Sequence, residues 1–332
     1  MTTEPESFLE NHKRTIFLIA LFLVIFISVR LVIHPVNTTD YTSHVTGLKA
    51  LWNGQNPYIV SPNYYMPPWS LVFLSPLADQ PPETWLALAV AIFVTEIMDL
   101  GGPAGLLLLL HPVFYTLISS SNPEWLLVGP GLWLLHRAPR GWGRGLAWLL
   151  LACKPQTTLF LLLFDGWTAL RQRDWCAFGL AGITAGGTLL LFPQVFSRLL
   201  RPFDWSATVL SNYGLVGALV ATAVILALRW TRRADRETLG LLLAPIWSIY
   251  MLEYSYTATL FTLRRAGWLR TALFVAGGIG LAYLFWQGFH VSEPIGTLGM
   301  VVLAALLAPN NTRPVAAPEN DAQTPAQSAA PG

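Results

Sequence analysis

The stretch IFLIALFLVIFISVRLVI, residues 16–33, decides the fold class of this chain. It follows the basic pair Lys13-Arg14, and no small-residue cleavage site comes after it. The run is too long for the apolar core of a signal peptide and long enough for a transmembrane helix, which needs about 18 or more apolar residues. We therefore interpret it as a retained signal anchor with the N-terminus, residues 1–14, in the cytoplasm.

The composition of the whole chain also indicates a membrane protein. Of its 332 residues, 54% are hydrophobic and 11% are charged, and the mean hydropathy is +0.50. A soluble domain carries about 25% charged residues, so this chain has too little charge to cover an aqueous surface. The net charge of +2 is too small to favour nucleic-acid binding. The two cysteines form no C-x-x-C pair, and no Cys/His cluster is present, so neither a disulfide framework nor a zinc site is expected.

Apolar segments continue to residue 308 and alternate with short basic clusters. Basic residues favour the cytoplasmic side, which gives about twelve crossings with both ends inside if the short segment 69–78 is re-entrant. The prediction is an all-α, polytopic transmembrane bundle over 15–308, followed by a disordered cytoplasmic tail at 309–332. The remaining apolar segments are 84–98, 105–119, 125–136, 145–153, 156–168, 175–192, 213–228, 238–252, 255–263, 269–286 and 294–308. Several are well below the ~20 residues of a simple span, and broken helices of this kind are tolerated where they line a protein cavity.

The longest polar interruption in the first half, residues 34–68, lies outside in this topology. Apolar spacing within 41–53 predicts a short helix in the membrane interface, Asn53-Gly54 predicts a turn, and the prolines that follow predict non-helical chain. Asp40 lies a few residues beyond the first span, where a carboxylate can act as a general base for an acceptor hydroxyl. Spacing alone leaves open the alternative of a solvated loop acid.

An ordered set of motifs runs through this loop: Asp40-Tyr41, then GLKAL (47–51), GQNPY (54–58), YYMPP (64–68) and Pro76-Leu77. In order and spacing it resembles the first outer loop of the polyprenyl-phosphate-sugar-dependent glycosyltransferases of the GT-C superfold. The most similar branch includes the bacterial alpha-mannosyltransferases of phosphatidylinositol mannoside and related glycolipid assembly.

The resemblance covers roughly residues 10–170. LACKPQ (151–156) resembles the Lys-Pro break of that family, whereas SNPE (121–124) stands where many relatives carry a Gly-Gln-x-Asn step. The second half of the chain is similar in hydropathy only.

What the resemblance implies is an inverting transfer of a sugar, mannose-like in that branch, from a polyprenyl-phosphate donor. The acceptor would be a lipid or cell-envelope glycan on the outer face of the plasma membrane, with Asp40 as the base. The sequence shows no D-x-D pair and no glycine-rich phosphate loop, so neither a nucleotide-sugar site nor a cofactor is expected, and metal dependence stays open.

Three basic residues are predicted to contact the donor phosphate: Lys154, at a helix break on the outer side, and Arg198 and Arg201, which lie outside against the positive-inside rule. The alternatives are a snorkelling lysine and outer charges that are merely tolerated. Candidate substrate-binding residues share the outer side with Asp40; they are His34, His44, Tyr41, Tyr58, Tyr65, Asn122, Glu124 and Glu253.

Each of these candidates also has an ordinary interpretation. The histidines and tyrosines suit a membrane interface, and Asn122 before Pro123 is a normal helix-start signal. A different functional class, a transporter or flippase of a lipid-linked saccharide, is the main alternative to an enzyme. It would be expected to show internal repeats and ionisable residues near the middle of spans, and we see no repeat. A non-catalytic membrane partner is a third interpretation.

Overall fold

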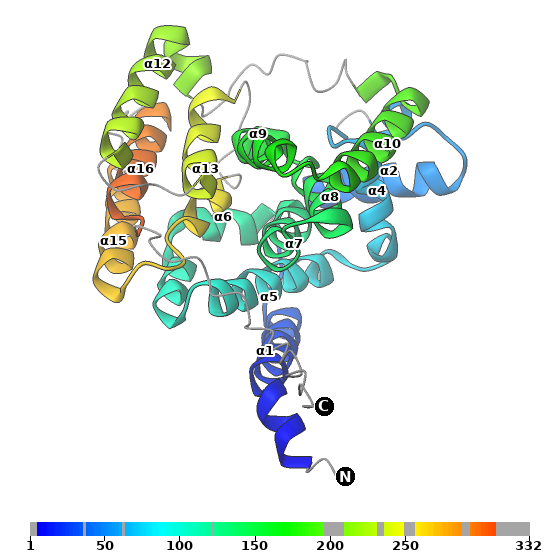
Figure 1. Cartoon of the computed structure of the whole chain (residues 1–332), viewed down its shortest axis with the longest axis horizontal. Coiled ribbons are helices and arrows are strands. Elements are labelled where there is room, and N and C mark those ends of the chain that lie inside the picture. Colours follow the sequence, from blue (N-terminus) through cyan, green and yellow to red (C-terminus); the bar gives the residue numbers. More distant parts are fainter. Residues whose placement is uncertain are drawn as a thin grey trace, which may run out of the picture.

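A computed structural model describes residues 5–35, 38–61, 64–120, 122–195, 209–230, 236–248, 256–286 and 293–309. Within these ranges every regular element is a helix and there is no strand, which confirms the all-α prediction (Figure 1). Arg198, Arg201 and Glu253 lie outside the described residues, as does the tail from 310 onward.

The helices follow the predicted apolar segments closely. In chain order they are α1 (Pro5–Val32), α2 (Thr39–Trp52), α3 (Pro57–Val60), α4 (Pro68–Leu74), η1 (Ser75–Leu77), α5 (Pro82–Leu100), η2 (Pro103–Leu110), α6 (Pro112–Ser120), α7 (Glu124–Arg137), α8 (Gly141–Leu151), α9 (Pro155–Arg171), α10 (Trp175–Leu191), α12 (Val209–Trp230), α13 (Arg236–Trp247), α14 (Thr257–Phe261), α15 (Trp268–Trp286) and α16 (Glu293–Leu307). Each predicted segment from 84–98 onward contains or overlaps at least one of them.

The outer loop is more helical than its prolines predicted. Helix α2 covers the predicted interfacial helix, and the turn after it places Gly54 at φ 69°, a conformation that glycine adopts without strain. The prediction of non-helical chain beyond Gly54 is wrong at α3. There Pro57 occupies the first helical turn, and the Asn56 side chain accepts a hydrogen bond from the Tyr58 amide at 3.0 Å, so this proline begins a helix instead of preventing one.

Two ion-pair groups define one end of the bundle. Asp99, near the end of α5, pairs with Arg137 at the end of α7. At the start of α13, the Glu237 carboxylate lies 2.8 Å from Arg264 and 2.9 Å from the His136 ring, which precedes Arg137 on α7. We call this the basic end. Arginines that were predicted to be cytoplasmic, among them Arg137 and Arg264, thus lie at the same end of the bundle, and the orientation in the membrane stays a prediction.

The opposite end of the bundle carries Asp40, and we call it the Asp40 end. Asn122, just before α7, donates a hydrogen bond to Asp40 at 2.6 Å, and Asn56 donates to Gln194, beyond the end of α10, at 3.2 Å. The 14 residues of α7 run from this end to the basic end, a distance of about 20 Å at 1.5 Å per residue.

Helix length and burial divide the bundle into a core and a periphery. Helices α7, α8 and α13 have 14, 11 and 12 residues and are largely buried, and Figure 1 shows α7 and α8 in its middle. Helices α10, α12 and α15, with 17, 22 and 19 residues, expose large apolar side chains. Exposure reaches 84% at Leu190, 79% at Ile183, 74% at Val216 and 73% at Leu269. Helices α7, α8 and α13 are therefore largely enclosed by other helices, whereas α10, α12 and α15 contribute much of the exposed apolar surface.

One helix of the described chain, His12–Val32 within α1, is long and apolar enough to cross a membrane by length and composition, with a mean hydropathy of 2.8. Shorter apolar helices of 10–17 residues are Pro68–Leu77, Trp175–Leu191, Tyr213–Arg229, Trp268–Leu284 and Leu298–Leu307. The number of crossings, about twelve, stays a prediction.

Candidate active site

Asp40 and Asn122 form the contact on which the candidate site is built. The amide Nδ2 of Asn122 donates to Oδ2 of Asp40 at 2.6 Å, across 82 positions of sequence. The same side chain accepts a hydrogen bond from the Glu124 amide at 2.8 Å through its Oδ1. Asn122 therefore supports the first turn of α7, as the helix-start interpretation predicts, and also orients the Asp40 carboxylate, which was not predicted; its substrate role stays a prediction. Oδ1 of Asp40 is not used in this contact.

Glu124 and Lys154 were predicted to bind different substrates, and the structure pairs them. The Lys154 ammonium lies 3.8 Å from Oε2 of Glu124, and the side chains are 9% and 0% exposed. Lys154 comes from the break between α8 and α9, whereas Glu124 opens α7. A buried lysine needs an opposite charge, because leaving it uncompensated costs several kcal/mol.

His44 links the two pairs. Its Nδ1 lies 2.6 Å from the Asp40 carbonyl, one turn earlier on α2, and both Asp40 and Lys154 are close enough to affect its charge. Burial lowers the pKa of His44 to about 4, so the ring is neutral at pH 7 and Nδ1 is the donor to the carbonyl. Its buried Nε2 has no hydrogen-bond partner within the described chain, and Tyr64 packs edge-on against the ring at 5.4 Å.

The Lys154-Pro155 break differs in one respect from the prediction. Pro155 does begin a new helix, but carbonyls at the break accept hydrogen bonds from threonines of that helix. The Thr158 hydroxyl donates to the Leu151 carbonyl at 2.7 Å, and the Thr157 hydroxyl donates to that of Lys154 at 2.9 Å. These two threonines satisfy the backbone locally, so Lys154 supplies the charged group at the break.

The tyrosines of the loop motifs contact mainly the loop itself. Tyr58 is 1% exposed, and its hydroxyl donates to the Met66 carbonyl at 2.7 Å, which joins the GQNPY and YYMPP motifs. The Tyr64 hydroxyl lies 2.5 Å from that of Ser70. Tyr65 is partly buried beside these contacts. The contacts give the loop a fixed shape, on which α2 presents Asp40 and His44.

Two other predicted residues have partners near the start of α5. The His34 ring lies 3.5 Å from the Glu83 carboxylate. The Tyr41 hydroxyl donates to the Gln80 carbonyl at 2.8 Å, and its ring packs edge-on against Trp85 at 5.3 Å. The structure therefore unites Asp40, His44, Asn122, Glu124 and Lys154, whereas His34 and Tyr41 join the outer loop to α5. Their substrate roles stay predictions.

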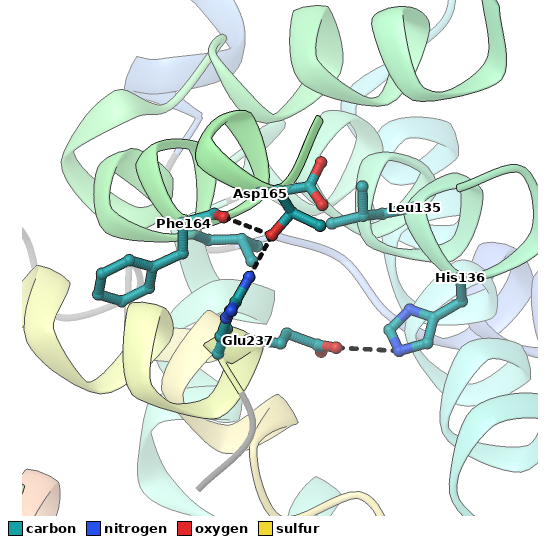
Figure 2. Close-up of a pocket in the computed structure, with 8 residues that line it drawn as sticks. Leu135, His136, Phe164, Asp165 and Glu237 are labelled. Carbon is teal, nitrogen blue, oxygen red and sulfur yellow. Dashed lines mark hydrogen bonds and ion pairs between the residues drawn. The ribbon is translucent and has the colours of Figure 1, made fainter. Parts of the chain in front are cut away.

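A cavity of about 180 Å³, lined by both apolar and charged side chains, lies at the basic end, between α7, α9 and α13 (Figure 2). Its walls are Leu135, His136, Leu161, Phe164, Asp165, Thr168, Arg236 and Glu237. The charges there are paired within the chain: Glu237 with His136 and Arg264, and Asp165 with Arg144 at 3.1 Å. Arg236 donates to the Thr168 hydroxyl. These contacts join α7, α8, α9 and α13 and contain none of the predicted site residues.

Replacing Asn122 with alanine tests the central contact. Asn122→Ala removes the hydrogen bond to Asp40 and the one from the Glu124 amide, so we expect a loss of about 1–3 kcal/mol in the free energy of unfolding. Thermal unfolding of the purified protein measures it. Asn53→Ala, at an exposed turn, is the matched control and should change stability little. Equal midpoints for the two variants would contradict the contact.

Comparison of the chain with protein-family models, with curated proteins and with solved structures found no match in any of the three. Its function is therefore inferred from the Asp40 end itself.

Proposed function

We propose that this chain is a GT-C-like membrane glycosyltransferase that moves a sugar, mannose-like in the branch it resembles, from a polyprenyl-phosphate donor to a lipid or cell-envelope acceptor. The reaction takes place on the outer face of the plasma membrane at the Asp40 end. The transporter or flippase of a lipid-linked saccharide is the alternative.

The observation that carries the proposal is the convergence of a carboxylate and an ammonium from distant parts of the chain. Asp40 belongs to α2 and Lys154 to the α8–α9 break, and α7 joins them through Asn122 and Glu124. A base for a hydroxyl and a cation for a phosphate are the two groups that transfer from a phosphate-linked sugar needs. Their assembly at one end supports an enzyme.

The reaction that fits these groups is a single displacement. The acceptor hydroxyl oxygen forms a bond to the anomeric carbon while the bond from that carbon to the phosphate oxygen breaks. The proton of the hydroxyl goes to Asp40, for which Oδ1 is suited because Asn122 already holds Oδ2. The electron pair of the broken bond leaves with the polyprenyl phosphate, whose negative charge Lys154 stabilises. A phosphate leaving group needs no general acid.

The exposed surface of the outer helices supports the membrane part of the proposal. Ile183 and Leu190 on α10 and Val216 on α12 are each more than 70% exposed. Soluble monomers rarely expose large contiguous apolar patches. A hydrocarbon environment explains the exposure without further partners. The arginine ion pairs of the described residues gather at the basic end, which we assign to the cytoplasm.

Site-specific labelling tests the proposed orientation. In a background without native cysteines, Asp79→Cys at the Asp40 end should react with an impermeant maleimide in intact cells, because Asp79 is 72% exposed there. Arg140→Cys, in the exposed turn before α8, should react only after permeabilisation. The reverse labelling pattern would contradict the assignment of the basic end to the cytoplasm.

A transfer assay tests the catalytic assignment. Purified protein in lipid, supplied with polyprenyl-phosphate sugars and a glycolipid acceptor, should form product, and Asp40→Asn should lower the rate by about 10²-fold or more because the amide cannot take the proton. Asp79→Asn is the matched control, since it removes an exposed carboxylate that pairs with Lys49 instead. Normal activity of Asp40→Asn, with expression unchanged, would contradict the role of Asp40 as the base. Movement of donor across the membrane without product would support the flippase.

A further inference from the structure

Two buried groups at the Asp40 end contact each other where a ligand is expected. In the proposed function Lys154 stabilises the donor phosphate, yet its ammonium lies 3.8 Å from the Glu124 carboxylate. Neither side chain is more than 9% exposed, so water does little to screen the pair. An anion that binds Lys154 closely must therefore share it with Glu124 or take its place.

The charges around Lys154 make sharing unfavourable. Asp40 lies within electrostatic range of the same buried ring, His44, as Lys154 does, and that ring is neutral. With a phosphodiester added, one ammonium would be shared between the Glu124 carboxylate and the phosphate, with the Asp40 charge within electrostatic range of the same ring. Two negative charges that share one cation in a partly buried site repel each other strongly. A retained Glu124 contact would thus weaken phosphate binding strongly.

The position of Glu124 allows displacement. Its amide is fixed by the Asn122 side chain at 2.8 Å at the first turn of α7, so the backbone is anchored. The carboxylate is connected to it by a flexible two-carbon side chain, which can rotate while the helix stays in place. The N-terminal end of α7 also favours a negative charge, so the carboxylate keeps a stabilising environment after it leaves Lys154.

We propose that Glu124 is an internal counter-ion that holds Lys154 when the site is empty and is displaced by the donor phosphate. The inference rests on the proposed function. Glu124 neutralises the buried ammonium in the empty state and, as a competitor for Lys154, sets how tightly the site holds phosphate. The same competition acts on the product, a polyprenyl phosphate monoester, because Glu124 can take back Lys154 as the product leaves.

Binding of dodecyl phosphate to the purified full chain tests this competition without requiring turnover. Glu124→Gln should bind this probe about tenfold more tightly than wild type, because the competing charge is gone. Lys154→Met should abolish binding, both alone and combined with Glu124→Gln. Asp79→Asn is the matched control, since it removes a carboxylate of the same end that pairs with Lys49, and it should bind like wild type.

A second variant covers the case in which Glu124→Gln does not fold because Lys154 is left uncompensated. Glu124→Asp keeps the charge on a side chain one methylene shorter, so it should hold Lys154 less well and bind the probe more tightly than wild type. Unchanged affinity in the folded Glu124 variants, with binding still dependent on Lys154, overturns the counter-ion and leaves the proposed function intact. Binding that is absent or independent of Lys154 in every variant contradicts the phosphate role of Lys154, and the counter-ion with it.

Discussion

The hydrogen bond from Asn122 to Asp40 joins the two parts of the molecule that matter for function. Without it, α2 would be a short helix of the outer loop with one partly exposed acid, and α7 would be a core helix with an unrelated start. The Asn122 side chain donates a hydrogen bond to the Asp40 carboxylate and accepts one from the Glu124 amide in the first turn of α7. Because Glu124 opens that turn and pairs with Lys154 from the α8–α9 break, this side chain connects Asp40 with the other charged groups of the candidate site.

The bundle has short buried helices in its core, longer apolar helices at its periphery, and different sets of charged groups at its two ends. Helices α7, α8 and α13 are too short to cross a bilayer alone, and among the longer helices α10 packs against α8 and α12 against α13. One end is closed by ion pairs such as Asp99 with Arg137 and Glu237 with Arg264. The other holds a smaller set of charges, in which a buried lysine meets a buried carboxylate. The ion pairs at the basic end stabilise the packing of neighbouring helices. In the proposed function, the Glu124–Lys154 pair instead provides a cation for a bound phosphate.

Much of this fold was predictable from the sequence, because apolar runs and basic clusters report helices and their ends directly. Asp40, Asn122, Glu124 and Lys154 were predictable as candidates, since polar residues at helix ends are rare in such a chain. Their pairing was not predictable, because no local pattern connects residues 82 positions apart. The sequence suggested separate ligands for Glu124 and Lys154, and the side chains are in fact each other's partners. The helical start at Pro57 is not evident from the sequence, because proline ends most helices in their interior but favours a helix at its first turn.

The central claim is that the Asp40 loop and the start of α7 form one site. Cross-linking in membranes tests it most directly, with Asp40→Cys and Asn122→Cys combined in a background free of native cysteines and treated with a short bifunctional thiosulfonate. The account predicts rapid cross-linking of this pair and none for Asn122→Cys with Arg140→Cys, which lies at the basic end, the other end of α7, about 20 Å away. Failure of the first pair to cross-link, with both cysteines reactive singly, would contradict it.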